Sequence, residues 1–88
     1  MTYHATISVT LRPSILDPEG KAVHQALQNL GQTSIANVRV GKRFEMDIEA
    51  DTESEAYRIA ETACENVLAN PVMENYAIEV EAPAGISA

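Results

Sequence analysis

The sequence predicts an α+β fold, a two-layer sandwich with the order β-α-β-α-β and both helices on one face of the sheet. Two observations lead to this prediction. Three segments have the apolar–polar alternation of half-buried strands, and the two segments between them have the apolar spacing of amphipathic helices. A chain of 88 residues is short enough for one domain, which we place at 1–82 with a frayed tail at 83–88.

The first strand and the first helix are predicted from local pattern. Apolar residues occupy every second position from Tyr3 to Leu11, and Pro13 ends the strand because proline has no amide hydrogen for a ladder. Asp17 then supplies an N-cap, and Pro18 suits the first helical position. The helix has one apolar stripe and is expected to end at Gly31, a left-handed cap. The stripe is Val23, Ala26, Leu27 and Leu30.

The middle segment predicts one long strand that bends at Gly41. Five apolar residues share even positions on both sides of this glycine, and a two-residue hairpin there would divide them between two faces. They are Val38, Val40, Phe44, Met46 and Ile48. If the strand instead breaks at Gly41, the order becomes the ferredoxin-like βαββαβ. Residues 38–50 would span about 43 Å, more than the ~25 Å of a compact domain. We therefore expect the strand to overhang and to pair with a second copy, which extends the sheet.

The second helix and the last strand complete the pattern. Residues 52–55, Thr-Glu-Ser-Glu, form a capping box. The helix that follows has a stripe of mostly small residues, and Asn70-Pro71 ends it. The stripe is Ala56, Ala60, Ala63, Cys64 and Val67, with Ile59 and Leu68 at its edges. A final alternation over 76–81 predicts a short strand.

Composition excludes several functions. Six Lys and Arg against thirteen Asp and Glu give a net charge of −7, which argues against nucleic acid as a partner. No apolar run approaches the roughly 20 residues of a membrane span, and the N-terminus lacks signal-peptide features, so we expect a cytoplasmic protein with no membrane contact. The glycine spacing fits no nucleotide loop. The single cysteine, Cys64, lies on an apolar stripe and is interpreted as a buried thiol.

Charged residues form two groups near the middle of the chain. Six acids alternate along it and are interpreted as a solvated strand face that runs into an acidic helix start, with a cation site or an acid/base pair as the alternative. They are Glu45, Asp47, Glu49, Asp51, Glu53 and Glu55. Three cations, Arg39, Lys42 and Arg43, surround Gly41. They either offset the nearby acids or dock an acidic surface of another protein. His4 and His24 are interpreted as surface or interface residues.

Five motifs in this order resemble the PurS family over Tyr3 to about Glu81. They are Ile7-Ser-Val-Thr-Leu11, Asp17-Pro-Glu-Gly20, Ala26-Leu27 with Leu30-Gly31, Val38-Arg-Val-Gly-Lys42, and Tyr76 with Ile78-Glu-Val80. PurS is the small subunit of phosphoribosylformylglycinamidine (FGAM) synthase, which converts FGAR to FGAM with ATP and glutamine in purine biosynthesis. The resemblance implies a non-catalytic subunit that bridges the large synthetase subunit and the glutaminase subunit and aids ammonia transfer. ATP and magnesium are then expected on the large subunit, and no catalytic, cofactor or metal residue in this chain.

Two functions from different classes follow from these observations. The first is an interaction subunit, a homodimer or tetramer whose middle strand makes the self-contact and whose loops contact the larger subunits. The loop residues expected at partner contacts are Asp17, Pro18, Gly20, Arg39, Gly41, Lys42 and Arg43. The second is a small dimeric regulatory domain of ferredoxin-like type that binds an amino acid or a similar ligand.

Overall fold

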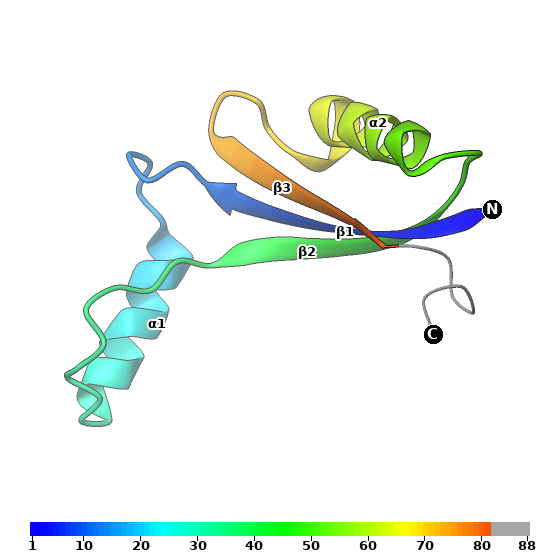
Figure 1. Ribbon diagram of the computed structural model, residues 1–88. Helices are drawn as coiled ribbons and strands as arrows, with labels where there is room; N and C mark the ends of the chain where they lie inside the picture. Colours follow the sequence, from blue (N-terminus) through cyan, green and yellow to red (C-terminus); the bar gives the residue numbers. More distant parts are fainter. Residues whose placement is uncertain (82–88) are drawn as a thin grey trace.

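The computed structural model describes residues 1–81 and contains one antiparallel sheet with the strand order β2-β1-β3 (Figure 1). The central strand β1 is Thr2–Leu11, and its neighbours are β2, Gly41–Glu49, and β3, Glu74–Glu81. Helix α1, Pro18–Asn29, follows β1, and helix α2, Glu53–Ala63, follows β2. The predicted order of strands and helices is confirmed. The predicted tail at 83–88 lies outside the described residues.

Helix α2 covers one face of the sheet, and the core lies between them. Ala5, Ile7 and Val9 of β1 are fully buried, as the alternation predicted. Ala56 and Ala60 of α2 are also fully buried, and their small side chains let the helix lie close to the sheet. Burial of an aliphatic side chain such as Ile7 stabilises the fold by about 1.5–3 kcal/mol. The core is thin and is centred on β1.

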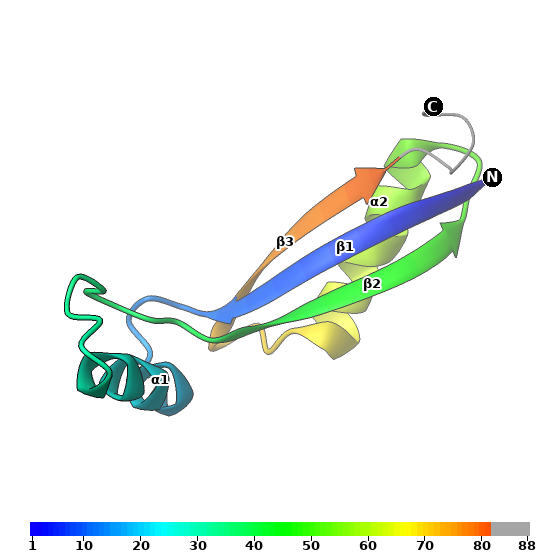
Figure 2. The same ribbon diagram turned by 90° about the horizontal axis from the view of Figure 1, so that it is seen from below.

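No helix among residues 1–81 covers the opposite face of the sheet, which Figure 2 shows in front of α2. Polar side chains of β1 and β2 alternate with the core residues and point to this side. The register places His4 opposite Asp47 and Thr6 opposite Glu45. We call this surface the open face. Its exposed acids confirm the prediction of a solvated, acidic strand face on β2.

The expected position of α1 on the sheet is wrong. Helix α1 projects beyond the end of the sheet, and the returning chain runs beside it (Figures 1 and 2). The helix packs on this returning segment, because His24 Nε2 and Gln28 Nε2 lie 2.7 and 3.2 Å from the Ile35 carbonyl oxygen. We call residues 18–40 the arm. An amphipathic stripe indicates that a helix has an apolar face, but not which surface covers it.

The middle segment is extended through Gly41 without a hairpin, as favoured by the parity of its apolar residues. Its pairing with β1 starts only at Gly41, so residues 38–40 belong to the arm and the paired strand is shorter than predicted. The additional strand of a ferredoxin-like βαββαβ order is absent from residues 1–81. Gly41 serves close approach, because a Cβ there would lie 2.6 Å from the Val9 carbonyl oxygen. The positive φ of 87° belongs to Gly31, the predicted cap.

The second helix ends differently from the prediction, because its last turn is wider than an α-helical turn. A π-helical turn, Cys64–Leu68, follows α2, and the amide of Ala69 donates to the Cys64 carbonyl oxygen at 3.0 Å. A π turn inserts one extra residue, so later side chains rotate relative to an α-helix. Cys64 stays buried, whereas Val67, predicted on the apolar stripe, is 80% exposed. No described helix is both long and apolar enough to cross a membrane.

Candidate interaction site

The predicted partner-binding residues gather where the arm joins the sheet. Asp17 lies at the centre of this junction, with its side chain buried. Its Oδ1 accepts a hydrogen bond from the Gly20 amide at 2.9 Å, which caps α1, and its Oδ2 accepts one from the Val40 amide at 2.8 Å. One carboxylate therefore binds both chain segments of the arm.

The electrostatics of the junction favour the ionised form of Asp17. The hydrogen bond from the Gly20 amide, followed by that from Val40, lowers the pKa of the carboxyl below its usual value, and the positive charge of Arg39 acts in the same direction. Charge-assisted hydrogen bonds to backbone amides are among the stronger hydrogen bonds in proteins. Asp17 therefore holds the arm in place as an anion at neutral pH.

Gly20 is required at this position because of close contact. A Cβ on Gly20 would lie 2.5 Å from both Asp17 Oδ2 and the Val38 carbonyl oxygen. Contacts this short do not occur for real side chains. The glycine of the Asp17-Pro18-Glu19-Gly20 sequence thus lets the first turn of α1 lie against the returning chain.

Arg39 fixes the loop between β1 and α1. Its Nη2 donates to the carbonyl oxygens of Arg12 at 2.9 Å and Ile15 at 3.0 Å, and lies 3.4 Å from that of Leu11. Arg39 was grouped with Lys42 and Arg43 as a basic cluster on the basis of sequence distance. In the structure its guanidinium donates hydrogen bonds to its own chain. Arg39 therefore stabilises the base of the arm.

The other two cations of the predicted cluster lie on opposite sides of the sheet. Lys42 shares the parity of Phe44 and faces the side of α2, with its Nζ 4.0 Å from Glu74 Oε2. Arg43 has the opposite parity and lies 3.8 Å from Glu45 Oε1 on the open face. Their side chains are 64% and 66% exposed. The structure does not bring Arg39, Lys42 and Arg43 together as one patch.

The residues predicted for self-contact also divide into two groups. Val38 and Val40 lie in the arm, half-buried, and Phe44 and Met46 are half-buried on β2 beside the core. Ile48 is 7% exposed and belongs to the core. Four of the five residues therefore have exposed surface that a partner could contact, whereas Ile48 packs in the core of its own chain.

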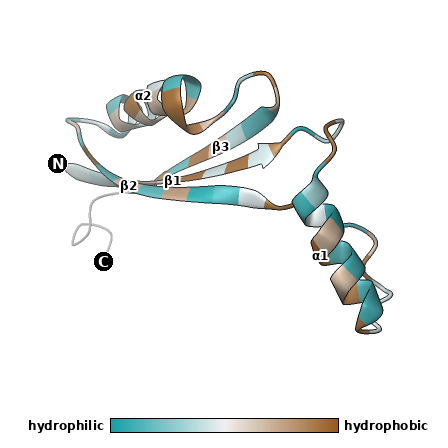
Figure 3. Ribbon diagram, turned by 180° about the vertical axis from the view of Figure 1, so that it is seen from behind, coloured by the Kyte–Doolittle hydropathy of each residue, from teal (hydrophilic) through white to brown (hydrophobic). Residues whose placement is uncertain are grey.

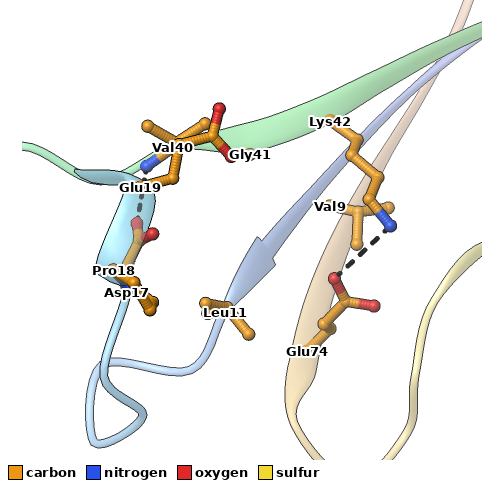
Figure 4. Close-up of a pocket in the computed structure, with 9 residues that line it drawn as sticks. All are labelled: Val9, Leu11, Asp17, Pro18, Glu19, Val40, Gly41, Lys42 and Glu74. Carbon is orange, nitrogen blue, oxygen red and sulfur yellow. Dashed lines mark hydrogen bonds and ion pairs between the residues drawn. The ribbon is translucent and has the colours of Figure 1, made fainter. Parts of the chain in front are cut away.

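A groove lies beside the junction, between the end of the sheet and the first turn of α1 (Figure 4). Its volume is about 390 Å³. Pro18 and Glu19 form the wall on the arm side, and Lys42 and Glu74 flank the opposite side. The remaining lining residues are Val9, Leu11, Asp17, Val40 and Gly41.

His4 forms a cluster with two carboxylates that the sequence did not indicate. Its Nδ1 lies 3.0 Å from Asp47 Oδ1, and its Nε2 lies 3.2 Å from Glu45 Oε1. The hydrogen bond with Asp47, and then that with Glu45, raises the pKa of His4. The signal was the even position of His4 in a strand, but the antiparallel register was needed to place it beside these acids.

Two other candidates from the sequence are the cation site and the Cys64 thiol. Within residues 1–81, no group of three or more His, Cys, Asp or Glu side chains has a geometry that could hold a metal ion. Cys64 is a free thiol and fully buried. Burial raises the pKa of this thiol, and the nearby carboxylates of Glu61 and Glu65 raise it further. The prediction of a buried thiol is confirmed.

The arm exposes apolar side chains far from the core. Leu30 is 79% exposed and Val23 is 41% exposed, and Leu16, in the loop just before the arm, is 70% exposed. Figure 3 shows the apolar segments of α1 projecting away from the sheet. The radius of gyration is 16.7 Å, whereas a compact chain of this length has about 12 Å. Exposed apolar surface of this kind is typical of protein–protein contact sites.

The fold and the junction define a small α+β protein with a projecting arm, a shape suited to contact with other chains. The chain belongs to the PurS family, because the model of that family, described as phosphoribosylformylglycinamidine (FGAM) synthase, matches residues 4–82. The resemblance predicted from the sequence motifs is therefore confirmed.

Relatives and solved structures agree with this assignment. The chain is 48% identical over 84 residues to the phosphoribosylformylglycinamidine synthase subunit PurS of Synechocystis, covering 96% of this chain and 84% of that protein. The crystal structure of Methanocaldococcus jannaschii PurS has a TM-score of 0.83 at 33% identity, covering 92% of this chain and 98% of that one. A chain of the PurLQS structure from Thermotoga maritima has a TM-score of 0.86 at 30% identity, covering 92% and 99%.

Proposed function

We propose that this protein is the bridging subunit of an FGAM synthase complex, which holds the glutaminase and synthetase subunits together and aids ammonia transfer between them. ATP and magnesium are bound by the synthetase subunit, and this chain supplies contact surface. The observation that carries the proposal is the arm, because it projects from the sheet and its apolar side chains, Leu30 above all, are exposed among the described residues 1–81. The likeness to a chain of the PurLQS structure supports the same role.

The arm is suited to this role because its direction is fixed. Asp17 joins the start of α1 to the returning segment at Val40, and Arg39 joins that segment to three carbonyl oxygens at the end of β1 and in the loop before the arm. A projecting element with a fixed direction loses less conformational entropy on binding than a flexible one. Leu16 and Leu30 then present apolar surface at opposite ends of α1.

The protein associates with a second copy through the side of β2. This strand lies at the edge of the sheet, and Phe44 and Met46 are only half-buried beside it. Val38 and Val40 continue the same extended segment into the arm. An edge strand with unpaired backbone groups and half-covered apolar side chains is stabilised by pairing with another strand. The resulting dimer or higher oligomer extends the sheet.

The surfaces for the larger subunits lie at the junction and on the arm. Lys42 and Arg43 are the exposed cations of this region, and they meet acidic partner surfaces on the two sides of the sheet. Pro18 offers a rigid exposed contact at the start of α1. Asp17, Gly20, Arg39 and Gly41 act indirectly, because they set the shape of the junction.

The function is tested by reconstitution from purified subunits. FGAM formation is measured with the synthetase and glutaminase subunits, with and without this protein, and with glutamine or ammonium chloride as nitrogen source. We expect omission to abolish most glutamine-dependent synthesis and to leave ammonium-dependent synthesis unchanged, because only the first requires the two subunits to be coupled. Equal glutamine-dependent rates with and without the protein would show that it is not the bridge.

A further inference from the structure

The groove at the junction holds two opposite charges beside an apolar floor, Lys42 and Glu74, and the bridging function proposed above uses only Lys42. Leu11 is half-buried and follows the parity of Val9, a fully buried core residue of β1, so the floor continues the apolar face of the sheet beyond α2. Val40 adds an apolar side chain from the arm. The volume of about 390 Å³ lies within the range of small-ligand pockets, about 300–1,000 Å³.

Glu74 is the more constrained of the two charged residues. Its side chain is only 15% exposed. Its Oε1 accepts a hydrogen bond from the Asn70 amide at 2.7 Å, which fixes the carboxylate on the wall of the groove. Its Oε2 has Lys42 Nζ at 4.0 Å, longer than the 2.7–2.9 Å typical of a charge-assisted hydrogen bond. This oxygen is therefore positioned to accept a hydrogen bond from a cationic group in the groove.

Lys42 supplies the complementary charge. Its ammonium lies next to Glu74 on the same side of the groove, and its side chain is 64% exposed, so the flexible stem can move to meet a ligand (Figure 4). The two groups are close enough to face one molecule and too far apart to form a direct hydrogen bond. A ligand that carries both charges would satisfy Lys42 and Glu74 at once.

We infer that the groove binds a free α-amino acid with an aliphatic side chain. Its ammonium group donates to Glu74 Oε2, its carboxylate accepts from Lys42 Nζ, and its side chain packs on Leu11 and Val40. Because the groove lies between the sheet and the arm, the ligand braces α1 against the sheet. This site does not depend on the bridging function, and its test does not involve the other subunits.

The test is an NMR titration of the full chain at neutral pH, with L-leucine as the probe. We expect saturable shifts of the amides that line the groove, namely Val9, Leu11, Gly41 and Lys42. Isocaproate lacks the ammonium group and isoamylamine lacks the carboxylate, so each should bind about tenfold more weakly or worse. N-acetyl-leucinamide presents only the side chain and tests whether the groove takes a leucine of a partner protein.

Matched variants separate the site from general charge effects. Glu74→Gln keeps an oxygen that can accept from the Asn70 amide, so the fold is retained while the charge is removed. We expect Glu74→Gln and Lys42→Gln each to weaken L-leucine binding about tenfold or more. Glu79→Gln on the same strand and Lys21→Gln on α1 should leave it unchanged, because neither residue lines the groove.

Three results would overturn the inference. The first is the absence of saturable shifts at the groove amides up to the solubility of L-leucine. The second is equal binding of L-leucine and N-acetyl-leucinamide, which would make the groove a socket for a protein side chain. The third is equal loss of binding in the Glu74→Gln and Glu79→Gln variants, which would reduce the effect to net charge.

Discussion

The Asp17 carboxylate accepts hydrogen bonds from two amides, of Gly20 and Val40, that belong to opposite ends of the arm. The first bond caps α1, and the second holds the returning chain where it enters β2. A single side chain therefore joins the two ends of the arm at the point where it leaves the sheet.

Replacement of Asp17 by Asn or Ala should loosen the arm without unfolding the sheet. Loss of the N-cap and of the bond to Val40 should lower the Tm by roughly 5 °C and expose the arm to protease. Limited proteolysis followed by mass spectrometry locates the new cleavage sites, which we expect within residues 18–40. Glu19→Ala is the control, because Glu19 lies in the same turn and is exposed. Cleavage confined to other regions would contradict the proposed role of Asp17.

The Asp17 contact also predicts an acid dependence. Since the pKa of the carboxyl is lowered from its ordinary value of 3.8, its stabilisation is fully present above that value and is lost as the pH falls through the folded-state pKa. The difference in unfolding free energy between the wild type and Asp17→Asn should therefore shrink with acidification below about pH 4. Urea titrations at several pH values measure it. A constant difference would show that the charge of Asp17 contributes nothing.

Gly20→Ala should destabilise the protein, opposite to the usual effect in a helix. Alanine normally stabilises a helix relative to glycine by about 0.5–1 kcal/mol. Here its Cβ would lie 2.5 Å from Asp17 Oδ2 and from the Val38 carbonyl oxygen, so we expect a loss of about 1–3 kcal/mol. Urea unfolding of Gly20→Ala beside Lys21→Ala, an exposed neighbour, measures the effect. A gain in stability would show that the contact is easily relieved.

The contacts of His4 predict that the protein loses stability as the pH rises, which is opposite to the pH dependence expected for Asp17. Its pKa is raised from 6.5 by hydrogen bonds with Asp47 and Glu45, so its contribution is fully present below about pH 6.5 and is lost as the pH rises through the folded-state pKa. As the pH rises from about 6.5 through the folded-state pKa of His4, the free energy of unfolding of the wild type should fall relative to that of His4→Gln. NMR titration of the imidazole gives the pKa directly, and Asp47→Asn should lower it. An unchanged pKa in Asp47→Asn would rule out the pair.

Met46 and Ile48 separate self-association from folding. Both were expected on the contact strand, but Ile48 is buried and Met46 is half-buried beside the core. Ile48→Asp should cost several kcal/mol and unfold the chain, because it buries an unpaired charge. Met46→Asp should keep the circular dichroism spectrum of the fold and reduce the mass measured by light scattering. A folded Met46→Asp protein with the wild-type mass would place the self-contact elsewhere.

Local patterns predicted the secondary structure well because each depends on residues close in sequence. The alternation from Tyr3 to Leu11 requires only a strand with one buried face, and the Asp17–Gly20 cap requires only one turn of helix. The position of α1 depended on a contact between Asp17 and Val40, 23 residues apart, which no local pattern encodes. The π turn after α2 was missed for a related reason, since Val67 fits an α-helical stripe in the sequence.

The sequence predicted which residues belong to the candidate site, but not how their side chains are arranged in space. Arg39, Lys42 and Arg43 are neighbours in sequence, yet a strand directs successive side chains to opposite faces and the arm captures Arg39. The pairing of Lys42 with Glu74 joins strands on opposite sides of β1, so it required the strand order. The position of His4 beside its two acids required the antiparallel register of β1 and β2.

The strand order β2-β1-β3 also determines when the protein can fold during translation. The central strand is synthesised first, and its last hydrogen-bonding partner, β3, ends at Glu81. One edge of β1 therefore lacks its neighbour on the ribosome until nearly the whole described chain has emerged, although β2 and α2 are made earlier. Long-range strand pairing of this kind slows folding and leaves nascent chains open to aggregation. We expect the newly made chain to depend on chaperones more than its small size suggests.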